Sequence, residues 1–127
     1  MPVSVLPGDI WTVDDDVLWL SKDMKDRDRD PHERRHVVIA ISRDLGEDHS
    51  FPFLLCVPVT TKPTSGPVGR YETRIPAGTA GLTEYSVAPV YLLQPIHRSA
   101  LDEHKGALPL RRYQELLGQP LVFLGQL

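Results

Sequence analysis

Prolines and glycines are spread along almost the whole chain, and no other feature restricts its fold as strongly. The sequence has 127 residues, of which twelve are proline and nine are glycine. Proline interrupts helical hydrogen bonding, and glycine favours turns. The apolar stretches between them are short and rich in β-branched residues, as strands are. The pattern therefore predicts a turn-rich, mainly β protein rather than a helical bundle.

One domain, residues 1–127, is expected from the length, because a chain of this size can bury a sufficient core by itself. The hydrophobic content of 41% and the charged content of 24% are ordinary for a globular protein. Cys56 is the only cysteine, and its apolar neighbours predict a buried, inert thiol. The formal net charge of −3 argues against bulk electrostatic binding of long duplex nucleic acid, but it permits a small nuclease with a locally basic site.

Targeting signals are not evident. The N-terminus lacks a basic region followed by a long apolar one, and no apolar run approaches the ~18 residues of a membrane span. We therefore expect a cytoplasmic protein without a membrane partner.

Alternating and continuous apolar runs predict about five strands, followed by one helix. The expected strands are residues 9–13 (extended or returned by 17–20 after an acidic turn at 14–16), 36–42, 51–59, 70–75 and 86–93. Residues 43–50 and 60–69 are expected to be loops, and 94–107 to be irregular with one helical turn near Ser99.

The helix is expected at about residues 109–117. Pro109 fits its first position and Gly118 fits the residue after its end. The apolar stripe of this helix is expected to contact the core or a second copy; it comprises Leu110, Tyr113, Leu116 and Leu117. Residues 120–124, "PLVFL", are too apolar to remain in water, so the sequence predicts a homodimer.

Residues 21–34 carry alternating charges and almost no apolar side chain. They are either a solvated connection or a flap in which Arg27, Arg29 and Arg34 reach the phosphates of a nucleic acid. Trp19 lies beside this segment and is a candidate for stacking on unpaired bases, although aromatic residues in small barrels more often belong to the core.

Two apolar runs have a polar residue at one end. "RRHVVIAIS" begins with arginines, and "LCVPVTTKPTSG" passes into two threonines and a Pro/Gly-rich loop. Arg35 could bind phosphate through its planar guanidinium, or it could be a surface arginine paired with an acidic residue of the 21–34 segment. Thr60 could offer a hydroxyl to the same phosphate, or it could simply begin a turn.

The order of these motifs resembles the MazF/PemK family of toxin endoribonucleases. The stretches that carry the resemblance are "PGDIW", "RRHVVIAIS", "VPVTT", "AGLTEYSVAPVYLLQPIHRSAL" and "KGALPLRRYQELLG". His36 stands where the family has a proline, Leu93 where it often has an acidic residue, and the segment before Arg34 is longer than in the family.

The resemblance implies a small SH3-like fold, a strongly curved antiparallel sheet or partial barrel with a C-terminal helix. It also implies a homodimer, an antitoxin partner, and cleavage of single-stranded RNA without a metal or cofactor. Arg35 and Thr60 occupy the positions of the family's catalytic pair, whose strand ends lie side by side. In such a reaction the RNA 2′-hydroxyl attacks the adjacent phosphorus, and the protein stabilises the developing charge.

Four further residues are candidate auxiliaries: Thr61, Ser65, His36 and His32. The unperturbed pKa of a histidine lies near neutrality, which makes His36 a candidate general base. Neighbouring strand residues point to opposite faces, however, so His36 should face away if Arg35 faces the site. His32 and His36 have the spacing of a helical metal site, but Pro31 and the following strand oppose a helix, so no metal site is expected.

A second hypothesis assigns the chain the same fold but no catalytic activity. The chain could be a catalytically inactive MazF-like binding module, or a CcdB-like module that acts on a protein partner. The catalytic reading requires that Arg35 and Thr60 converge on one site, whereas the binding reading does not.

Overall fold

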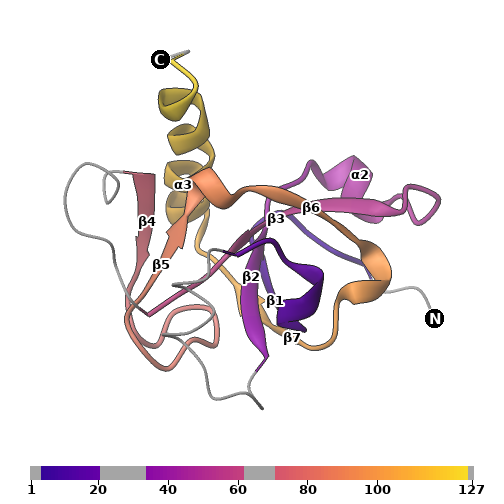
Figure 1. The fold of residues 1–127 in the computed structure, drawn as a ribbon, viewed down its shortest axis with the longest axis horizontal. Coiled ribbons are helices and arrows are strands. Elements are labelled where there is room, and N and C mark those ends of the chain that lie inside the picture. Colours follow the sequence, from indigo (N-terminus) through magenta and orange to yellow (C-terminus); the bar gives the residue numbers. More distant parts are fainter. Residues whose placement is uncertain (1–3, 21–33, 62–70, 126–127) are drawn as a thin grey trace.

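The protein is a mainly β domain built on one open antiparallel sheet, as the computed structural model shows for residues 4–20, 34–61 and 71–125 (Figure 1). The five strands of this sheet run in the order β6-β3-β2-β1-β7, and β4 and β5 form a separate hairpin. The strands are β1 (Asp9–Val13), β2 (Arg35–Ile39), β3 (Phe53–Pro58), β4 (Glu72–Ile75), β5 (Ser86–Pro89), β6 (Gln94–His97) and β7 (His104–Ala107). Strands β6 and β7 are the two edges of the sheet, so the sheet does not close into a full barrel. This confirms the prediction of a partial barrel.

Both faces of the five-stranded sheet are buried, which follows from alternation along each strand. One face carries Trp11, Val13, Val37, Ile39, Leu54 and Cys56, which pack with Leu18, Leu20, Leu92 and Ile96. The other face carries Ile10, Val38, Val57 and Val59, which pack with Ile75 of β4 and with Tyr113 and Leu116. Two cores therefore lie back to back, separated by the sheet.

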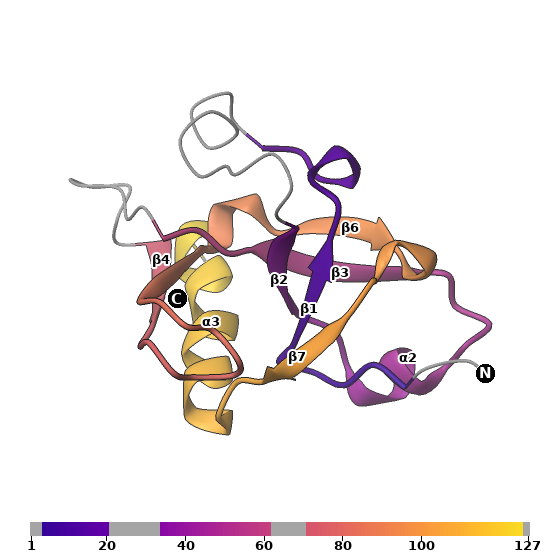
Figure 2. The same cartoon turned by 90° about the horizontal axis from the view of Figure 1, so that it is seen from below.

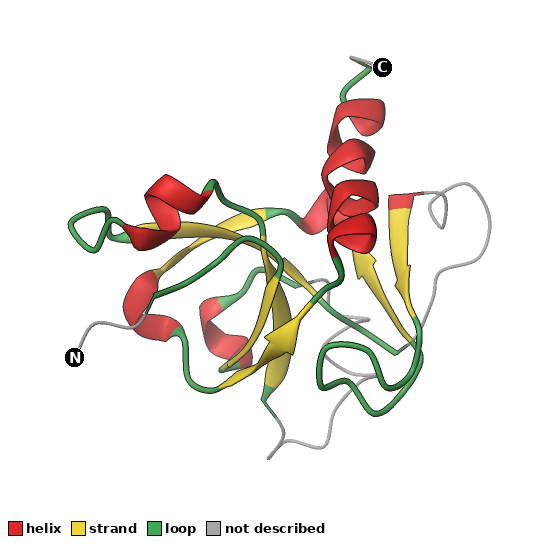
Figure 3. Cartoon of the chain, turned by 180° about the vertical axis from the view of Figure 1, so that it is seen from behind, coloured by secondary structure: helices red, strands yellow, loops and turns green. Residues whose placement is uncertain are grey.

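The C-terminal helix α3 (Leu110–Phe123) packs against β4 and the 3₁₀ turn η3 (Val90–Leu92), and it rises beside the β4–β5 hairpin (Figures 2 and 3). Tyr113 and Leu116 are its buried contacts, with 8% and 0% of their surface exposed. A short helix α2 (Arg43–Glu47) lies at the other end of the sheet, so the two helices do not touch in either view.

The predicted C-terminal boundary of α3 is wrong. The helix continues through Gly118 and Pro120 and ends only at Phe123. Leu124 is its C-cap, and Gly125 adopts a φ of 77°, the left-handed conformation that terminates many helices. The glycine that ends the helix is therefore Gly125, and Pro120 lies inside the last turns despite its missing N–H group.

Other predicted elements also need correction. Residues 17–20 are not a strand, because η1 (Asp15–Val17) folds the chain back after β1. Residues 43–50 contain α2, begun by the Ser42 side chain, which accepts a hydrogen bond from the Leu45 N–H group. Residues 94–107, expected to be irregular, supply both edge strands of the main sheet, although the helical turn at Ser99 is confirmed (η4, Arg98–Ala100).

A membrane-spanning helix is not found in the described ranges 4–20, 34–61 and 71–125, because none is long and apolar enough.

Candidate active site

Arg35 is the first residue of β2, and it is buried rather than on the surface. It is 7% exposed, and its Nε donates a hydrogen bond to Asp15 Oδ1 at 3.1 Å. Asp15 is 4% exposed, so the two groups form a buried ion pair. A guanidinium fixed in this way has a defined orientation, which suits it to recognise a planar or tetrahedral anion. The alternative interpretation of Arg35 as a surface arginine is therefore wrong.

The register of the sheet explains why Asp15 reaches Arg35. Val13 pairs with Arg35 across β1 and β2, so the segment that follows Val13 must pass beside the start of β2. η1 turns this segment inward, and its Asp14 side chain caps the turn by accepting a hydrogen bond from the Asp16 N–H group. The middle aspartate of the "DDD" run is thereby directed into the protein.

Thr60 lies at the end of the strand next to Arg35. Val37 pairs with Pro58 across β2 and β3, and continuing this register brings Arg35 opposite Thr60. The Arg35 Nη1 donates a hydrogen bond to the Val59 carbonyl oxygen at 3.2 Å. This carbonyl belongs to the peptide bond between Val59 and Thr60. The fold thus brings the two strand ends together.

Thr60 also joins the main sheet to the β4–β5 hairpin. Its N–H group donates to the Val87 carbonyl at 3.0 Å, and the Val87 N–H group donates back to the Thr60 carbonyl at 2.8 Å. Thr60 is buried, with only 4% of its surface exposed. Its backbone is hydrogen-bonded to β5, and it lies just beyond the end of β3 in the chain. A hydroxyl at this point would be held rigidly relative to the arginine.

Trp19 follows η1 and leaves 69% of its surface exposed. Its backbone is fixed by Gln94 of β6: the Trp19 N–H group donates to Gln94 Oε1 at 2.7 Å, and Gln94 Nε2 donates to the Trp19 carbonyl at 2.9 Å. An exposed aromatic ring on a fixed backbone is the arrangement that base stacking requires, and it is not a core residue.

His36 and Thr61 lie on the opposite face of the sheet from Arg35 and Thr60, as strand alternation requires. Both line a separate pocket, together with Arg34. Arg34 is half-exposed, and its Nε lies 2.9 Å from Asp102 Oδ2. The structure therefore separates these three candidates from the arginine–threonine pair.

Four predicted residues lie outside the described part of the chain: Arg27, Arg29, His32 and Ser65. Among the residues that the structure does describe, no three His, Cys, Asp or Glu side chains are grouped to hold a metal ion.

Sequence reasoning missed two contributors to this region, Asp15 and Gln94. Asp15 is one of three consecutive aspartates, and the sequence offers no signal that selects the middle one for burial. Gln94 lies in the segment expected to be irregular. The β3–β6 pairing that places it opposite Cys56 is a contact between residues far apart in the chain, which local patterns do not reveal.

The protein thus combines an open antiparallel sheet, a separate hairpin and a C-terminal helix with an arginine and a threonine at adjoining strand ends. Residues 7–119 match the family described as PemK-like, MazF-like toxin of type II toxin-antitoxin system. The chain belongs to this family. No curated protein sequence matches it significantly.

Solved structures support the fold assignment. The chain is similar to a chain of a MazE–MazF crystal structure from Deinococcus radiodurans, with a TM-score of 0.68 and 14% identity over 98% of this chain and 99% of that one. It is also similar to toxin MazF-mt6 of Mycobacterium tuberculosis, with a TM-score of 0.65 and 19% identity over 92% and 96%. A mycobacterial endoribonuclease solved with its cognate antitoxin gives a TM-score of 0.64 and 13% identity over 96% and 94%.

Proposed function

We propose that the protein is a toxin endoribonuclease that cleaves single-stranded RNA without a metal ion. The observation that carries the proposal is the convergence of Arg35 and Thr60 at adjoining strand ends in a chain of the MazF-like toxin family. The similarity to a solved mycobacterial endoribonuclease supports the same reading.

The proposed reaction needs positioning and charge stabilisation. The RNA 2′-oxygen forms a bond to the adjacent phosphorus, and the bond from phosphorus to the 5′-oxygen breaks. The 2′-hydroxyl gives up its proton, and the leaving 5′-oxygen receives one. The products are a 2′,3′-cyclic phosphate and a 5′-hydroxyl. Arg35 would stabilise the charge that develops on the non-bridging oxygens, and Thr60 would hold the same phosphate. His36 has no part in this step, because it lies on the other face of the sheet.

Incubation of the purified protein with mixed single-stranded RNA in excess EDTA tests this proposal. Discrete fragments with 2′,3′-cyclic phosphate ends support a metal-independent enzyme. Complete absence of cleavage at any protein concentration would contradict it.

The second candidate function is a MazF-like module that binds a protein partner without cleaving RNA. The burial of Arg35 favours this reading, because an arginine held by Asp15 and the Val59 carbonyl can serve the structure alone. One measurement separates the two functions. Only an endoribonuclease has an RNA-cleaving activity that Arg35→Lys can reduce, whereas a binding module has none.

An antitoxin is the partner we propose in either case, acting in the cytoplasm. The MazE–MazF complex from Deinococcus radiodurans and the mycobacterial complex with its antitoxin support this assignment.

A homodimer is the second part of the proposed assembly. Along α3 and its C-cap four leucines recur at intervals of seven, four and three residues, which places them on one helical face. They are Leu110, Leu117, Leu121 and Leu124, and 70%, 43%, 44% and 67% of their surfaces are exposed. An apolar stripe of this kind is costly to leave in water, and a second copy can cover it with the same stripe in an isologous contact.

A further inference from the structure

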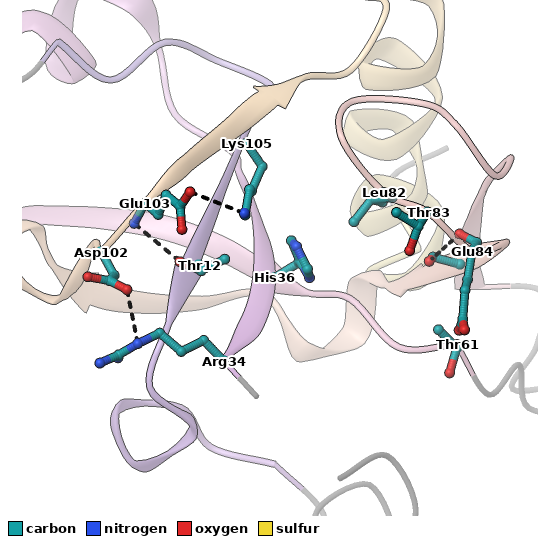
Figure 4. A pocket seen from close by; sticks show the side chains of 11 residues that line it. Thr12, Arg34, His36, Thr61, Leu82, Thr83, Glu84, Asp102, Glu103 and Lys105 are labelled. Carbon is teal, nitrogen blue, oxygen red and sulfur yellow. Dashed lines mark hydrogen bonds and ion pairs between the residues drawn. The ribbon is translucent and has the colours of Figure 1, made fainter. Parts of the chain in front are cut away.

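A pocket lies on the face of the sheet opposite to Arg35 and Thr60, as strand alternation requires. Figure 4 shows the side chains that line it. Its volume is about 510 Å³. One wall is formed by the main sheet, where Thr12 of β1 and His36 of β2 are direct cross-strand partners and Lys105 comes from β7. The opposite wall is the segment 82–86 that leads into β5, and Thr61 contributes at its edge.

The lining of this pocket is polar, and its charges nearly balance. Besides His36 it contains two cations, Arg34 and Lys105, and three carboxylates. Arg34 pairs with Asp102 at 2.9 Å, and Lys105 pairs with Glu103 at 3.2 Å. The third carboxylate, Glu84, makes no ion pair with any described residue. The pocket therefore offers one unneutralised negative group, which does not suit a phosphate.

A neutral ligand with its own hydrogen-bond donors fits this lining better. The carboxylate of Glu84 accepts hydrogen bonds only, so it favours an exocyclic amino group. Uracil offers only its N3–H, which is flanked by two carbonyl oxygens that a carboxylate repels. The imidazole of His36, which points between the two walls in Figure 4, supplies a flat ring for stacking. Leu82 is 4% exposed and gives the site an apolar floor. An unpaired nucleobase combines these features.

The position of the pocket relates it to the proposed cleavage site. Residues 34 and 36 flank Arg35, and Thr61 follows Thr60, so three residues of the pocket are sequence neighbours of the proposed catalytic pair. Because adjacent strand residues point to opposite faces, the pocket and the arginine–threonine pair lie on the two sides of the sheet at the ends of β2 and β3. An RNA strand with its phosphate at Arg35 and a nearby base in the pocket would cross from one face to the other at these strand ends.

We propose that this pocket binds one base of the RNA close to the cleaved bond, and that Glu84 selects a base with an exocyclic amino group, namely cytosine, adenine or guanine over uracil. This inference rests on the proposed endoribonuclease function. A peptide is a poorer occupant, because peptide grooves depend on apolar anchor sites and Leu82 is the only aliphatic hydrophobic side chain in this lining.

The first experiment measures base frequencies around the cut in a randomised RNA pool. The wild type should disfavour uracil at one position near the cleaved bond. Glu84→Gln keeps the size of the side chain but adds a donor, so the preference at that position should fall by about tenfold. The matched control is Glu47→Gln on α2, which should leave the frequencies as in the wild type. Identical frequencies for Glu84→Gln and the wild type at every position would overturn the proposal.

The second experiment does not depend on cleavage. Six-nucleotide 2′-O-methyl strands of only cytidine or only uridine cannot react, and each is titrated into ¹⁵N-labelled protein. The cytidine strand should shift the amide signals of Thr12, His36 and Thr83 more than the uridine strand, and Glu84→Gln should reduce that difference. Equal shifts from both strands, or none from either, would show that the pocket does not select an amino-bearing base, even if the wild type cuts RNA. Selective shifts in a protein that does not cleave RNA would support the proposed base-binding pocket and contradict the proposed endoribonuclease function.

Discussion

Arg35 and Asp15 form a buried ion pair, with Nε 3.1 Å from Oδ1 and side chains that are only 5% and 3% exposed. The arginine opens β2, and the aspartate belongs to the turn that follows β1. Removal of one partner from such a pair leaves an uncompensated charge in the interior. We therefore expect this ion pair to stabilise the fold and also to fix the orientation of Arg35, the residue that we assign to catalysis.

Asp15→Asn should lower the free energy of unfolding by about 3 kcal/mol, because the guanidinium of Arg35 loses its buried counter-charge. The control is Asp16→Asn, which makes the same change in net charge at an exposed neighbour and should cost less than about 0.5 kcal/mol. Urea denaturation of the two variants provides the comparison. Equal midpoints for both would mean that the ion pair contributes nothing.

Arg98 should be important for stability although it is far from the site. Its guanidinium donates to the carbonyl oxygens of Leu45, Gly46, Asp48 and Phe51, at 2.9 to 3.3 Å, and so ties α2 and the following turn to η4. Arg98→Ala should cost about 2 kcal/mol, because several carbonyls lose a charged donor. Arg111→Ala, whose side chain is 92% exposed, should cost almost nothing and serves as the control in thermal unfolding.

Two glycines of the turn beside the pocket provide a matched pair. Gly78 and Gly81 both have positive φ, of 84° and 79°, but a Cβ at Gly81 would lie 2.5 Å from the Lys105 carbonyl oxygen, whereas at Gly78 it would meet nothing within 4 Å. Gly78→Ala should cost about 1 kcal/mol from backbone strain alone. Gly81→Ala should cost clearly more and should shift the amide signals of β7. Equal unfolding energies for the two variants would show that the turn does not pack against β7 in this way.

Cys56 is fully buried, and burial raises the pKa of its thiol to about 12. The thiol should therefore react with a disulfide reagent at pH 8 only as fast as the protein unfolds. The sign of the pH effect follows from linkage: above the ordinary thiol pKa of 9.0 the unfolded chain loses this proton and the folded chain keeps it. Stability should fall between about pH 9 and pH 12, and Cys56→Ala should remove this contribution. Rapid labelling of the native protein would contradict the burial.

Dimerisation through α3 can be tested by charge. Leu117→Glu combined with Leu121→Glu should convert the dimer to a monomer in sedimentation at micromolar concentration, because two carboxylates would face their copies across the contact. Leu45→Glu changes an equally exposed leucine on α2 and should leave the dimer intact. A wild-type protein that sediments as a monomer would refute the assembly itself.

The sequence predicted the elements that depend on local pattern. The strands near residues 9–13, 36–42, 51–59 and 70–75 were recognisable because their apolar runs and flanking turns are local. The edge strands β6 and β7 were not, because "QPIH" and "HKGA" have no strand periodicity and are defined only by their partners. The sequence predicts helix α3 too short because Gly118 and Pro120 look like end signals, whereas the glycine in the left-handed conformation after the helix is Gly125.

The candidate site shows the same division. Alternation along β2 correctly separated Arg35 from His36, since it depends only on backbone geometry. The burial of Arg35 and its pairing with Asp15 could not be foreseen, because both depend on how η1 folds back over the sheet. The pocket around His36 and Glu84 joins segments about fifty residues apart, which only the tertiary structure brings together.

The most direct test of the proposed function compares RNA cleavage by the wild type and by Arg35→Lys in excess EDTA. Lysine keeps a positive charge beside Asp15 but lacks the planar fork of the guanidinium. The wild type should release fragments with 2′,3′-cyclic phosphate ends, and Arg35→Lys should cut about a hundredfold to a thousandfold more slowly while remaining folded by circular dichroism. Arg43→Lys, an exposed arginine of α2, controls for the substitution and should cut as the wild type does. Cleavage by folded Arg35→Lys at the wild-type rate would contradict the assignment of Arg35 as the catalytic group.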